Sequence, residues 1–589
     1  MDLEEKIIKK TWSRLRDDTG SFKKLLVRDT LDFLDFNNDL DSNIKKLIFE
    51  IKSSNYHPQK PYLHQSPKSK GISRPTVCFD VSDALVYRFC IEEIEDFLIE
   101  KTREIDTSIE YAIFGGLFIK GKKNLNEETF YEKIFDQYME YQRILKKFLN
   151  SKDYVVSSDI SSYFENINIL ITKDLVRSEV EDKKEIINLL FYFLENIITR
   201  NNYEVNTFNG IPQEDIDCSR LIAYYFLHSV DLEIIKFCEE NNCKYLRWVD
   251  DIKIFTDREV IGKKALRTFT ESLRKIGLTA SIEKTEINSS AEEMNNLLIN
   301  ENEKLDDITE RINIALSENN STEKLRIEAE ILYNNFFKDK KDSGRSFSKL
   351  LQRFFTLFSI FQSGILLNNI ERKIVQYPEI ASEKLMRYLV RNSKHENFES
   401  TIIDIINFLY SEENLYPSLE TNLLEMLLYL NKKDLSQGII KKIKILSEDI
   451  FFKNQYKSLS EYARAIALLL LFRFNFEKVG KIVKHYLSNF REEDYLLRKY
   501  LILVSLTIDN HKLSNMVLEK AKRDSNISIS RLVNLVERLE EIKNKSLIKK
   551  YLKEEFVYIW KNKINNEFIK EKYISVRAEI LKVLIERYS

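Results

Sequence analysis

The sequence is poor in cysteine and carries almost no net charge, and each shortage excludes a class of protein. Its five cysteines are scattered and none forms a CxxC pair, so a zinc ribbon or a redox motif is not expected. An odd, sparse set fits a reducing cytosol better than a secreted disulfide scaffold. The formal net charge of -1 argues against a protein that simply coats DNA, but it leaves room for an enzyme with one basic channel.

The sequence also lacks the patterns of a secretory signal and of a membrane span. The N-terminal residues MDLEEKIIKK are charged and contain no apolar signal-peptide core. The longest plain apolar run, from Ala465 to Phe472, is far shorter than the ~20 residues of a spanning helix. We therefore expect a soluble protein of the cytoplasm, without membrane contact.

Glycine and proline are scarce and unevenly distributed. Eight of the twelve glycines and five of the seven prolines lie before residue 290. These residues mark turns, and strand-like runs lie among them at 154–156, 245–249 and 252–255, with helix-like segments between. This alternation predicts an α+β domain over residues 1–290.

The remaining residues, 291–589, predict an all-α domain. Apolar side chains recur at helical spacing, for example at Leu532, Leu535, Val536 and Leu539. Short polar breaks separate one such segment from the next. The pattern predicts stacked helix pairs of a HEAT-like helical repeat, although no strict sequence period is present.

Three aspartates give the first chemical signal. Asp250 and Asp251 lie between two β-prone apolar runs, which predicts a β-hairpin whose tight turn carries both carboxylates. Asp159 follows a buried-looking strand and precedes a run of small residues. Each segment alone has an ordinary explanation, because aspartate is common in turns and at helix N-caps.

Together the two segments suit phosphoryl transfer from a nucleoside triphosphate. That reaction uses two divalent cations about 4 Å apart, which activate the attacking 3′-hydroxyl and hold the leaving pyrophosphate. Hard cations prefer carboxylate oxygens, which rigid strands can present. We therefore expect Asp159 and Asp250 to bridge two Mg²⁺ ions, or Mn²⁺ in their place, with Asp251 beside them.

Five short motifs follow one another between residues 50 and 290. They are Pro67-Lys68 with Arg74-Pro75, Asp159-Ile160-Ser161-Ser162-Tyr163-Phe164, Gly210-Ile211-Pro212-Gln213 with Ser219, Leu221 and Ala223, Trp248-Val249-Asp250-Asp251, and Gly277-Leu278-Thr279 to Lys284-Thr285. Each motif alone is weak, but five in this order form a strong signal. Their order resembles the fingers segment and motifs A, B, C and D of the reverse transcriptase family. The resemblance implies a fingers and palm domain that acts as a nucleotidyltransferase on dNTPs.

The resemblance also implies the ligands of the metals and a gate for the sugar. The metal contacts would lie at Asp159, Ile160, Asp250 and Asp251, and the three aspartates would be catalytic. Phe164 stands where the family keeps an aromatic ring that crowds the ribose 2′-position, which implies a preference for deoxynucleotides. The ordinary alternative for Phe164 is a plain core aromatic.

Four further residues would contact the substrate if the resemblance holds. Gln213 would hydrogen-bond near the incoming sugar and base, and Lys68 and Arg74 would neutralise triphosphate oxygens. Lys284 could donate a proton to the leaving pyrophosphate. For each basic residue the ordinary alternative is a solvated surface position.

The sequence departs from the family at three places. Trp248 replaces the usual tyrosine of motif C, and Glu214 follows Gln213 where the family generally has glycine. No primer-grip hairpin follows Lys284, and helical sequence begins instead. A helical region in place of the primer grip and ordinary thumb resembles the abortive-infection reverse transcriptases of bacterial antiphage defence (AbiK and AbiA types).

That branch implies a homo-oligomer and an unusual mode of synthesis. The AbiK type is associated with template-independent DNA synthesis primed from a protein tyrosine, which would leave the DNA product covalently attached. For this chain the mode is a hypothesis motivated by the missing thumb, and 29 tyrosines leave the priming residue unidentified.

Three other functions stay open. A conventional RNA-templated enzyme of the retron or group II intron type would need a template. A helical scaffold with an inactive polymerase domain would not need the three acids, which are intact here. A HEPN-type ribonuclease needs Arg and His on one helix with four to six residues between them. Only three residues lie between Arg391 and His395, so a surface or core position is the stronger interpretation of this histidine.

Overall fold

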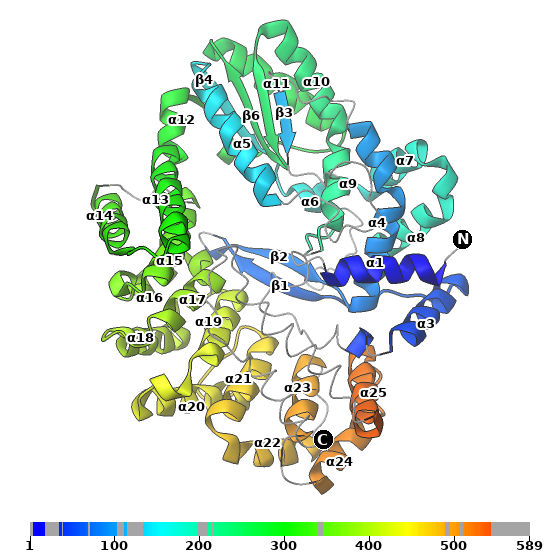
Figure 1. The fold of residues 1–589 in the computed structure, drawn as a ribbon. Coiled ribbons are helices and arrows are strands. Elements are labelled where there is room, and N and C mark those ends of the chain that lie inside the picture. The colour runs from blue at the N-terminus through cyan, green and yellow to red at the C-terminus, as the bar shows by residue number, and fades with distance from the viewer. Residues whose placement is uncertain are drawn as a thin grey trace. The chain divides into compact units, whose positions relative to one another are not determined.

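The computed structural model describes residues 4–17, 35–37, 39–68, 71–102, 111–114, 134–197, 210–214, 216–339, 345–488, 495–506, 508 and 511–542. Their contacts divide the chain into two compact units (Figure 1). The first unit comprises Met1–Leu25, Leu40–Leu63 and Thr76–Asn300, and the second comprises Leu26–Asp39, His64–Pro75 and Glu301–Ser589. Two short N-terminal segments therefore belong with the C-terminal part of the chain.

The first unit contains a five-stranded sheet with the order β3-β5-β6-β4-β7. Its strands are β3 (Tyr111–Phe114), β4 (Tyr154–Asp159), β5 (Lys244–Trp248), β6 (Asp251–Thr256) and β7 (Glu286–Ser289). β3 runs parallel to β5, and the other neighbours are antiparallel. The strands expected near residues 154, 245 and 252 are thus confirmed, as is the α+β class.

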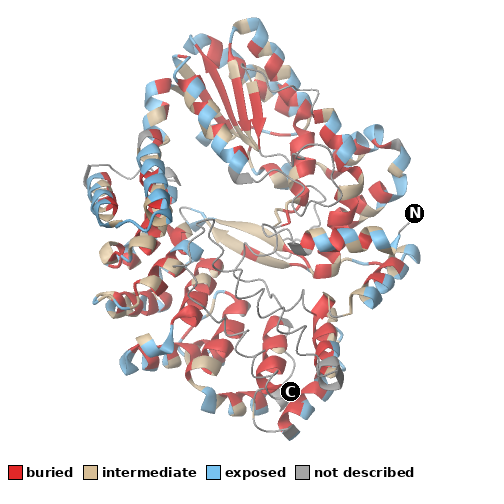
Figure 2. Ribbon diagram, viewed as in Figure 1, coloured by how far each residue is buried: buried red, intermediate tan, exposed pale blue. Residues whose placement is uncertain are grey.

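Helices cover both faces of this sheet. α10 (His228–Asn241) and α11 (Glu259–Lys275) pack on one face, and α5 (Ile134–Leu149) packs on the other. Figure 2 shows the central strands as buried, because neither face meets solvent. α11 approaches β4 closely where Gly262 has no side chain: a Cβ there would lie 3.0 Å from the Val156 Cγ2 atom.

The other described elements that lie wholly within the first unit are helices. Its helices are α1 (Glu5–Asp17), α3 (Leu40–Lys52), α4 (Val81–Thr102), α6 (Tyr163–Asn166), α7 (Ile169–Glu179), α8 (Lys184–Ile197), α9 (Cys218–Phe226) and α12 (Ser290–Asn296), with 3₁₀ turns η2 (Glu181–Lys183) and η3 (Ile282–Lys284). α4 contacts α1, α8 and α9 and is buried on most of its circumference, as its unbroken apolar runs predict. None of the five cysteines, all of which lie in described residues, forms a disulfide, and all five are buried.

The described part of the second unit is mostly helical. Its helices are α13 (Ile299–Ser317), whose first residues belong to the first unit, α14 (Glu323–Asp339), α15 (Arg345–Phe361), α16 (Ile370–Gln376), α17 (Glu383–Arg391), α18 (Phe398–Tyr410), α19 (Pro417–Tyr429), α20 (Gln437–Phe452), α21 (Glu461–Phe474), α22 (Phe476–Ser488), α23 (Tyr495–Leu506), α24 (His511–Ala521) and α25 (Ile527–Ile542), with 3₁₀ turns η4 (Gly364–Leu366), η5 (Pro378–Ile380) and η6 (Lys432–Asp434). Within the described ranges, every helix is too short or too polar to span a membrane.

Helices in the second unit contact partners two places along the chain. From α15 to α19 each helix contacts the second helix after it, and α21, α22 and α23 do the same. Stacked helix pairs give this order of contacts. The helical repeat itself stays a proposal.

The N-terminal segment around Asp35 is anchored within the second unit. Asp35 and Lys499 form an ion pair at 2.8 Å, and both side chains are fully buried. The Arg531 guanidinium lies 5.5 Å from the centre of the Phe36 ring.

The hairpin of β1 (Tyr62–Pro67) and β2 (Ser73–Cys78) extends across the division of the chain. Its tip, residues 64–75, belongs to the second unit, and the outer ends of both strands belong to the first.

Candidate active site

The end of β4 and the β5–β6 hairpin bring two carboxylate-bearing segments together. In the antiparallel register Asp159 lies opposite Asp251, and Asp251 lies opposite Trp248. Side chains of residues directly opposite each other leave the same face of a sheet, with Cβ atoms about 4.5–5.5 Å apart. Asp250 occupies the turn between the two strands. Carboxylates from sequence positions far apart therefore lie on neighbouring strands at one edge of the sheet.

The turn that carries Asp250 has a strained backbone. Val249 has φ 55°, a conformation that a β-branched residue rarely adopts. The expected strand 245–249 therefore ends one residue early, because Val249 forms the turn with Asp250. The Val249 N–H donates to the carbonyl of Phe114 at 3.2 Å, and Arg247 donates to the Val249 carbonyl at 2.7 Å. These bonds hold the turn in a shape that its sequence alone would not favour.

Arg247 supports the turn through a buried ion pair with Asp231 on α10. Its Nε and Nη2 atoms donate to the Asp231 carboxylate at 2.8 and 2.5 Å, and the Tyr245 hydroxyl donates to the same carboxylate at 2.7 Å. Burial lowers the pKa of Arg247, but the charge of Asp231 and the hydrogen bond to it, together with the neighbouring Tyr245 and Tyr224, raise the pKa above its usual value. No local pattern in the sequence indicates this pair, because arginine in a strand usually faces solvent.

Two buried tyrosines indicate where the acidic doublet acts. Burial raises the pKa of Tyr141 on α5 well above its usual value, and the negative charge of Asp251 raises it further. Burial also raises the pKa of Tyr163 on α6, where Arg247 opposes the rise and Asp250 adds to it. The two adjacent carboxylates thus act on tyrosines of different helices.

The Asp159 carboxylate is paired with Lys284. The Lys284 ammonium donates to the Asp159 Oδ2 atom, and the Asp159 side chain keeps 19% of its surface exposed. Lys284 ends the 3₁₀ turn η3, and two backbone bonds fix the chain before it: Ser281 N donates to the Asp159 carbonyl at 2.7 Å and Ser161 N to the Thr279 carbonyl at 2.9 Å. Motif D is thereby held against motif A.

The donors at this edge fit hard divalent cations in kind. Asp159, Asp250 and Asp251 supply carboxylate oxygens from two neighbouring strands, which Mg²⁺ and Mn²⁺ prefer. Among the described residues, however, no three acidic, histidine or cysteine side chains converge as a ready metal site. Because Lys284 holds the Oδ2 atom of Asp159, a cation that binds this oxygen competes with the lysine.

Ile160 can contribute to a metal site only through its main-chain carbonyl, because its side chain is apolar and buried. It forms an isolated antiparallel bridge with Ala280. The hydrogen bonds of that bridge are made by Asp159 and Ser161, so the Ile160 carbonyl is directed away from the Ala280 segment.

Motif A and motif B are joined behind the predicted sugar gate. The Phe164 carbonyl accepts from Ile211 N at 2.8 Å, and the Ile167 carbonyl accepts from Gly210 N at 2.8 Å. Gly210 has φ +99°, and a Cβ there would lie 2.6 Å from the carbonyl oxygen of Glu165, so only glycine fits. The Phe164 ring packs edge-on against Tyr163 at 5.5 Å and is half-buried. Its role as a gate stays a prediction.

Glu214, the departure from the family pattern, has a structural function. Its carboxylate accepts from Ile216 N at 2.5 Å and from Ser219 N at 2.6 Å, which satisfies free N–H groups at the start of α9. The preceding Gln213 offers its carbonyl to Val77 N at 2.6 Å on β2. The Gln213 backbone is thus fixed, and its contact with a substrate stays a prediction.

A second buried ion pair lies two residues along β6 from Asp251. Lys253 donates to Glu293 at 2.7 Å and to the Ser157 hydroxyl at 2.9 Å. Burial raises the pKa of Glu293, but the Lys253 charge and hydrogen bonds lower it to below its usual value overall. This pair could not be predicted from the sequence, because the spacing of Lys253 and Glu293 carries no local signal.

Trp248 packs into an aromatic cluster with α5. Its ring lies 5.4 Å from both Tyr138 and Tyr141 and 6.4 Å from Phe114. Because Trp248 lies opposite Asp251, α5 covers the sheet face from which Asp251 emerges. This packing explains why a ring larger than tyrosine fits here.

Lys68 and Arg74 lie on the tip of the β1–β2 hairpin, in the second unit. Lys68 is exposed and Arg74 is half-buried. Their contact with a triphosphate stays a prediction.

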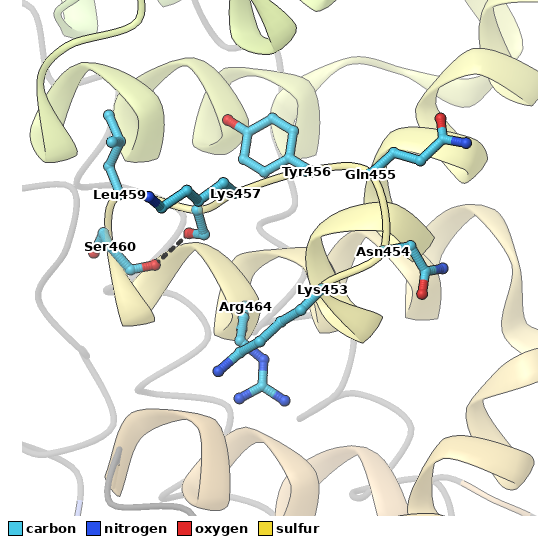
Figure 3. A pocket seen from close by; sticks show the side chains of 9 residues that line it. Lys453, Asn454, Gln455, Tyr456, Lys457, Leu459, Ser460 and Arg464 are labelled. Carbon is cyan, nitrogen blue, oxygen red and sulfur yellow. Dashed lines mark hydrogen bonds between the residues drawn. The ribbon is translucent and has the colours of Figure 1, made fainter.

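A cavity of about 380 Å³ lies in the second unit at the loop between α20 and α21 (Figure 3). Lys453, Lys457 and Arg464 line it together with the amides of Asn454 and Gln455. Figure 3 shows the side chains of Lys453 and Arg464 extending in the same direction. The cavity has no acidic lining residue, so it does not offer the oxygen ligands of a metal-assisted reaction.

Comparison with known proteins agrees with the geometry of the sheet edge. Residues 68–300 match the family model described as reverse transcriptase (RNA-dependent DNA polymerase). The chain is also 29% identical over 168 residues to the retron Ec83 reverse transcriptase of Escherichia coli. These aligned residues make up 28% of this chain and 52% of that protein. The chain thus spans about half the length of the curated relative it matches. The matched segment has the domain type of an RNA-directed DNA polymerase, which is a nucleotidyltransferase.

Proposed function

We propose that this chain is a DNA polymerase of the reverse transcriptase type that acts in bacterial antiphage defence by abortive infection. The observation that carries the proposal is the register of Asp159 opposite Asp251, with Asp250 in the adjoining turn. All three acids lie inside the segment that matches the reverse transcriptase model. Defence is supported by the sequence resemblance to abortive-infection enzymes.

In this proposal the three aspartates and the Ile160 carbonyl hold two Mg²⁺ ions. When bound, the ions supply Lewis-acid activation of a 3′-hydroxyl and charge neutralisation at the triphosphate. The 3′-oxygen bonds to the α-phosphorus, the bond from that phosphorus to its bridging oxygen breaks, and pyrophosphate leaves. Lys284 is placed beside Asp159, so on release it can protonate the leaving pyrophosphate.

Substrate selection is assigned to residues around motifs A and B. Phe164 excludes the ribose 2′-hydroxyl, and Gln213 contacts the incoming sugar and base. Their backbones are fixed by bonds to Ile211 and Val77, which supports a rigid pocket wall. Lys68 and Arg74 neutralise the triphosphate.

We propose further that synthesis needs no template and begins on a tyrosine hydroxyl, so that the DNA stays attached to the protein. This mode is supported by the resemblance of the sequence to the AbiK type. We also propose that the C-terminal part forms a helical repeat in place of an ordinary thumb, and that the chain assembles as a homo-oligomer.

One assay separates these modes. The pure full-length chain is incubated with labelled dNTPs and Mg²⁺, with and without an RNA template and primer, and resolved on a denaturing protein gel. Label that migrates with the protein in the absence of template supports the protein-primed mode. An absolute need for template supports a conventional retron-type or intron-type enzyme. No incorporation in either case supports a scaffold with an inactive polymerase domain.

Two variants complete the assay. Asp250→Ala should abolish incorporation in every condition. Asp257→Ala removes an acid that pairs with Lys152 at 2.7 Å after the end of β6, outside the proposed site, and should retain activity. The same variants, compared for phage plating in bacteria, test whether the chemistry is needed for defence.

A further inference from the structure

Tyr416 connects the helices of the second unit (the helical unit) to the tip of the β1–β2 hairpin, which belongs to the same unit. Its hydroxyl donates to the Lys68 carbonyl at 2.7 Å and accepts from Gly71 N at 2.8 Å. Tyr416 directly precedes α19 and is 6% exposed. A single phenol group therefore makes hydrogen bonds to both sides of the hairpin tip. Such bonds need a hydroxyl that donates and accepts at once, which phenylalanine cannot replace.

The two strands of the hairpin alone hold its tip weakly. The hairpin is a two-stranded sheet, and such a ribbon is marginally stable when isolated in water. Within the tip, Lys68 N donates to the Ile72 carbonyl at 2.7 Å and the Ser73 hydroxyl donates to Gln65 at 2.9 Å. Gly71 has φ +80°, which suits a tight reversal of the chain. Contacts from outside the hairpin should therefore decide how precisely the tip is placed.

The other end of β2 is fixed at motif B. Val77 N donates to the Gln213 carbonyl at 2.6 Å, and Val77 forms a parallel bridge with Glu214. β2 is continuous from Ser73 to Cys78, so Arg74 lies between the end bonded at Gln213 and the tip bonded to Tyr416. A shift of the tip changes the position of Arg74 along with the strand.

We propose that Tyr416 is a positioning residue for triphosphate binding, through which the helical unit controls the fingers hairpin. This inference rests on the proposed function, because it assigns Lys68 and Arg74 to the triphosphate. It gives the helical unit a part in nucleotide affinity. Loss of the Tyr416 hydroxyl releases the tip, so the two cations bind the triphosphate less well, while the carboxylates that carry out the chemistry keep their places.

Tyr416→Phe tests the proposal in the full-length chain. We expect KM and the Kd for a labelled dNTP to rise roughly three- to tenfold, in line with the loss of one or two hydrogen bonds, with kcat unchanged. Amide hydrogen exchange at Gly71 should become faster. In an Arg74→Ala background the same substitution should have little further effect on KM, because both changes act on one contact.

Tyr410→Phe is the matched control. The Tyr410 hydroxyl donates to Asp449 at 2.8 Å within the same unit, so its loss removes a tyrosine hydrogen bond away from the hairpin. It should leave KM, dNTP binding and Gly71 exchange as in the wild type.

Two results overturn the proposal while leaving the proposed function in place. One is an unchanged KM and unchanged Gly71 exchange in Tyr416→Phe. The other is a lower melting temperature with reduced kcat and unchanged KM, which assigns Tyr416 to stability only. A wild-type chain that neither binds nor incorporates dNTP overturns the proposed function and this inference together.

Discussion

The ion pair between Lys284 and Asp159 competes with the metal binding that we propose at Asp159. A cation that binds the Asp159 Oδ2 atom displaces the lysine ammonium. Because the ion pair is partly exposed, breaking it costs about 0–1 kcal/mol. Lys284→Met should therefore lower the Mg²⁺ concentration that gives half-maximal incorporation by roughly two- to fivefold. If Lys284 also protonates pyrophosphate, kcat should fall by about 10²-fold or more. Magnesium titrations of the incorporation rate measure both effects.

Lys275→Met is the matched control for that substitution. Lys275 pairs with Glu233 at 2.7 Å at the surface of the same unit, away from the carboxylates. It should change neither the magnesium dependence nor kcat. A Lys284 variant with wild-type values of both would remove Lys284 from the site.

Phe164 gives a second prediction at the scale of one residue. Phe164→Ala should raise the use of ribonucleotides relative to deoxynucleotides by roughly tenfold or more, because a missing ring leaves room for the 2′-hydroxyl. The ratio of kcat/KM for a matched rNTP and dNTP measures it. Phe97→Ala, which removes an exposed ring on α4, should leave the ratio unchanged. Equal ratios in the Phe164 variant and the wild type would show that Phe164 is only a packing residue.

Single residues differed in how far the sequence could place them. Asp250 and Asp251 were both expected in a hairpin turn, because turn residues and β-prone runs are local signals. Asp250 lies in that turn, whereas Asp251 is the first residue of β6. Lys253 and Glu293 could not be foreseen as partners, because a buried ion pair depends on contacts 40 residues apart. The same holds for Glu214, which stands where the family generally has glycine. Its carboxylate accepts a hydrogen bond from Ser219 N at the start of α9.

At the scale of elements, the β5–β6 hairpin depends on the buried Arg247–Asp231 pair. Asp231→Ala leaves the guanidinium buried without its partner, so the free energy of unfolding should fall by about 3–5 kcal/mol. Urea unfolding measures the loss. Glu271→Ala removes an exposed pair with Arg267 on α11 and should cost less than about 1 kcal/mol. If the two variants unfold alike, the pair does not support the turn.

Strand β1 carries a pH-sensitive group. Burial lowers the pKa of His64 from 6.5 to about 4. Between these values the unfolded chain binds the proton and the folded chain does not, so stability is full above pH 6.5 and is lost as pH falls toward 4. The loss should reach about 3 kcal/mol. In His64→Leu the urea midpoint should vary less over this range, and an unchanged slope would contradict the burial effect.

The elements were predictable where their signals were local. Strand positions followed from β-prone runs, and helices after residue 290 followed from apolar spacing. Val249 was expected in a strand because valine favours β-structure, yet it occupies the turn with φ 55°. Tertiary bonds from Arg247 and Phe114 override that preference.

At the scale of the whole molecule, the sequence indicated a mixed part followed by a helical part. It gave no sign that residues 26–39 and 64–75 belong with the C-terminal unit. Those assignments depend on contacts such as Asp35 with Lys499 and Lys68 with Tyr416, which join positions hundreds of residues apart. Such contacts leave no periodic pattern in the sequence.

Iron-mediated cleavage tests most directly whether two distant acidic segments share metal ions. Fe²⁺ is substituted for Mg²⁺ in the full-length chain with a dNTP present, and ascorbate and peroxide generate radicals that cut the backbone near the ion. We expect cuts around residues 159–160 and around residues 249–251, both lost in Asp250→Asn and both retained in Asp257→Asn. Cuts at one segment without the other would contradict a shared metal site.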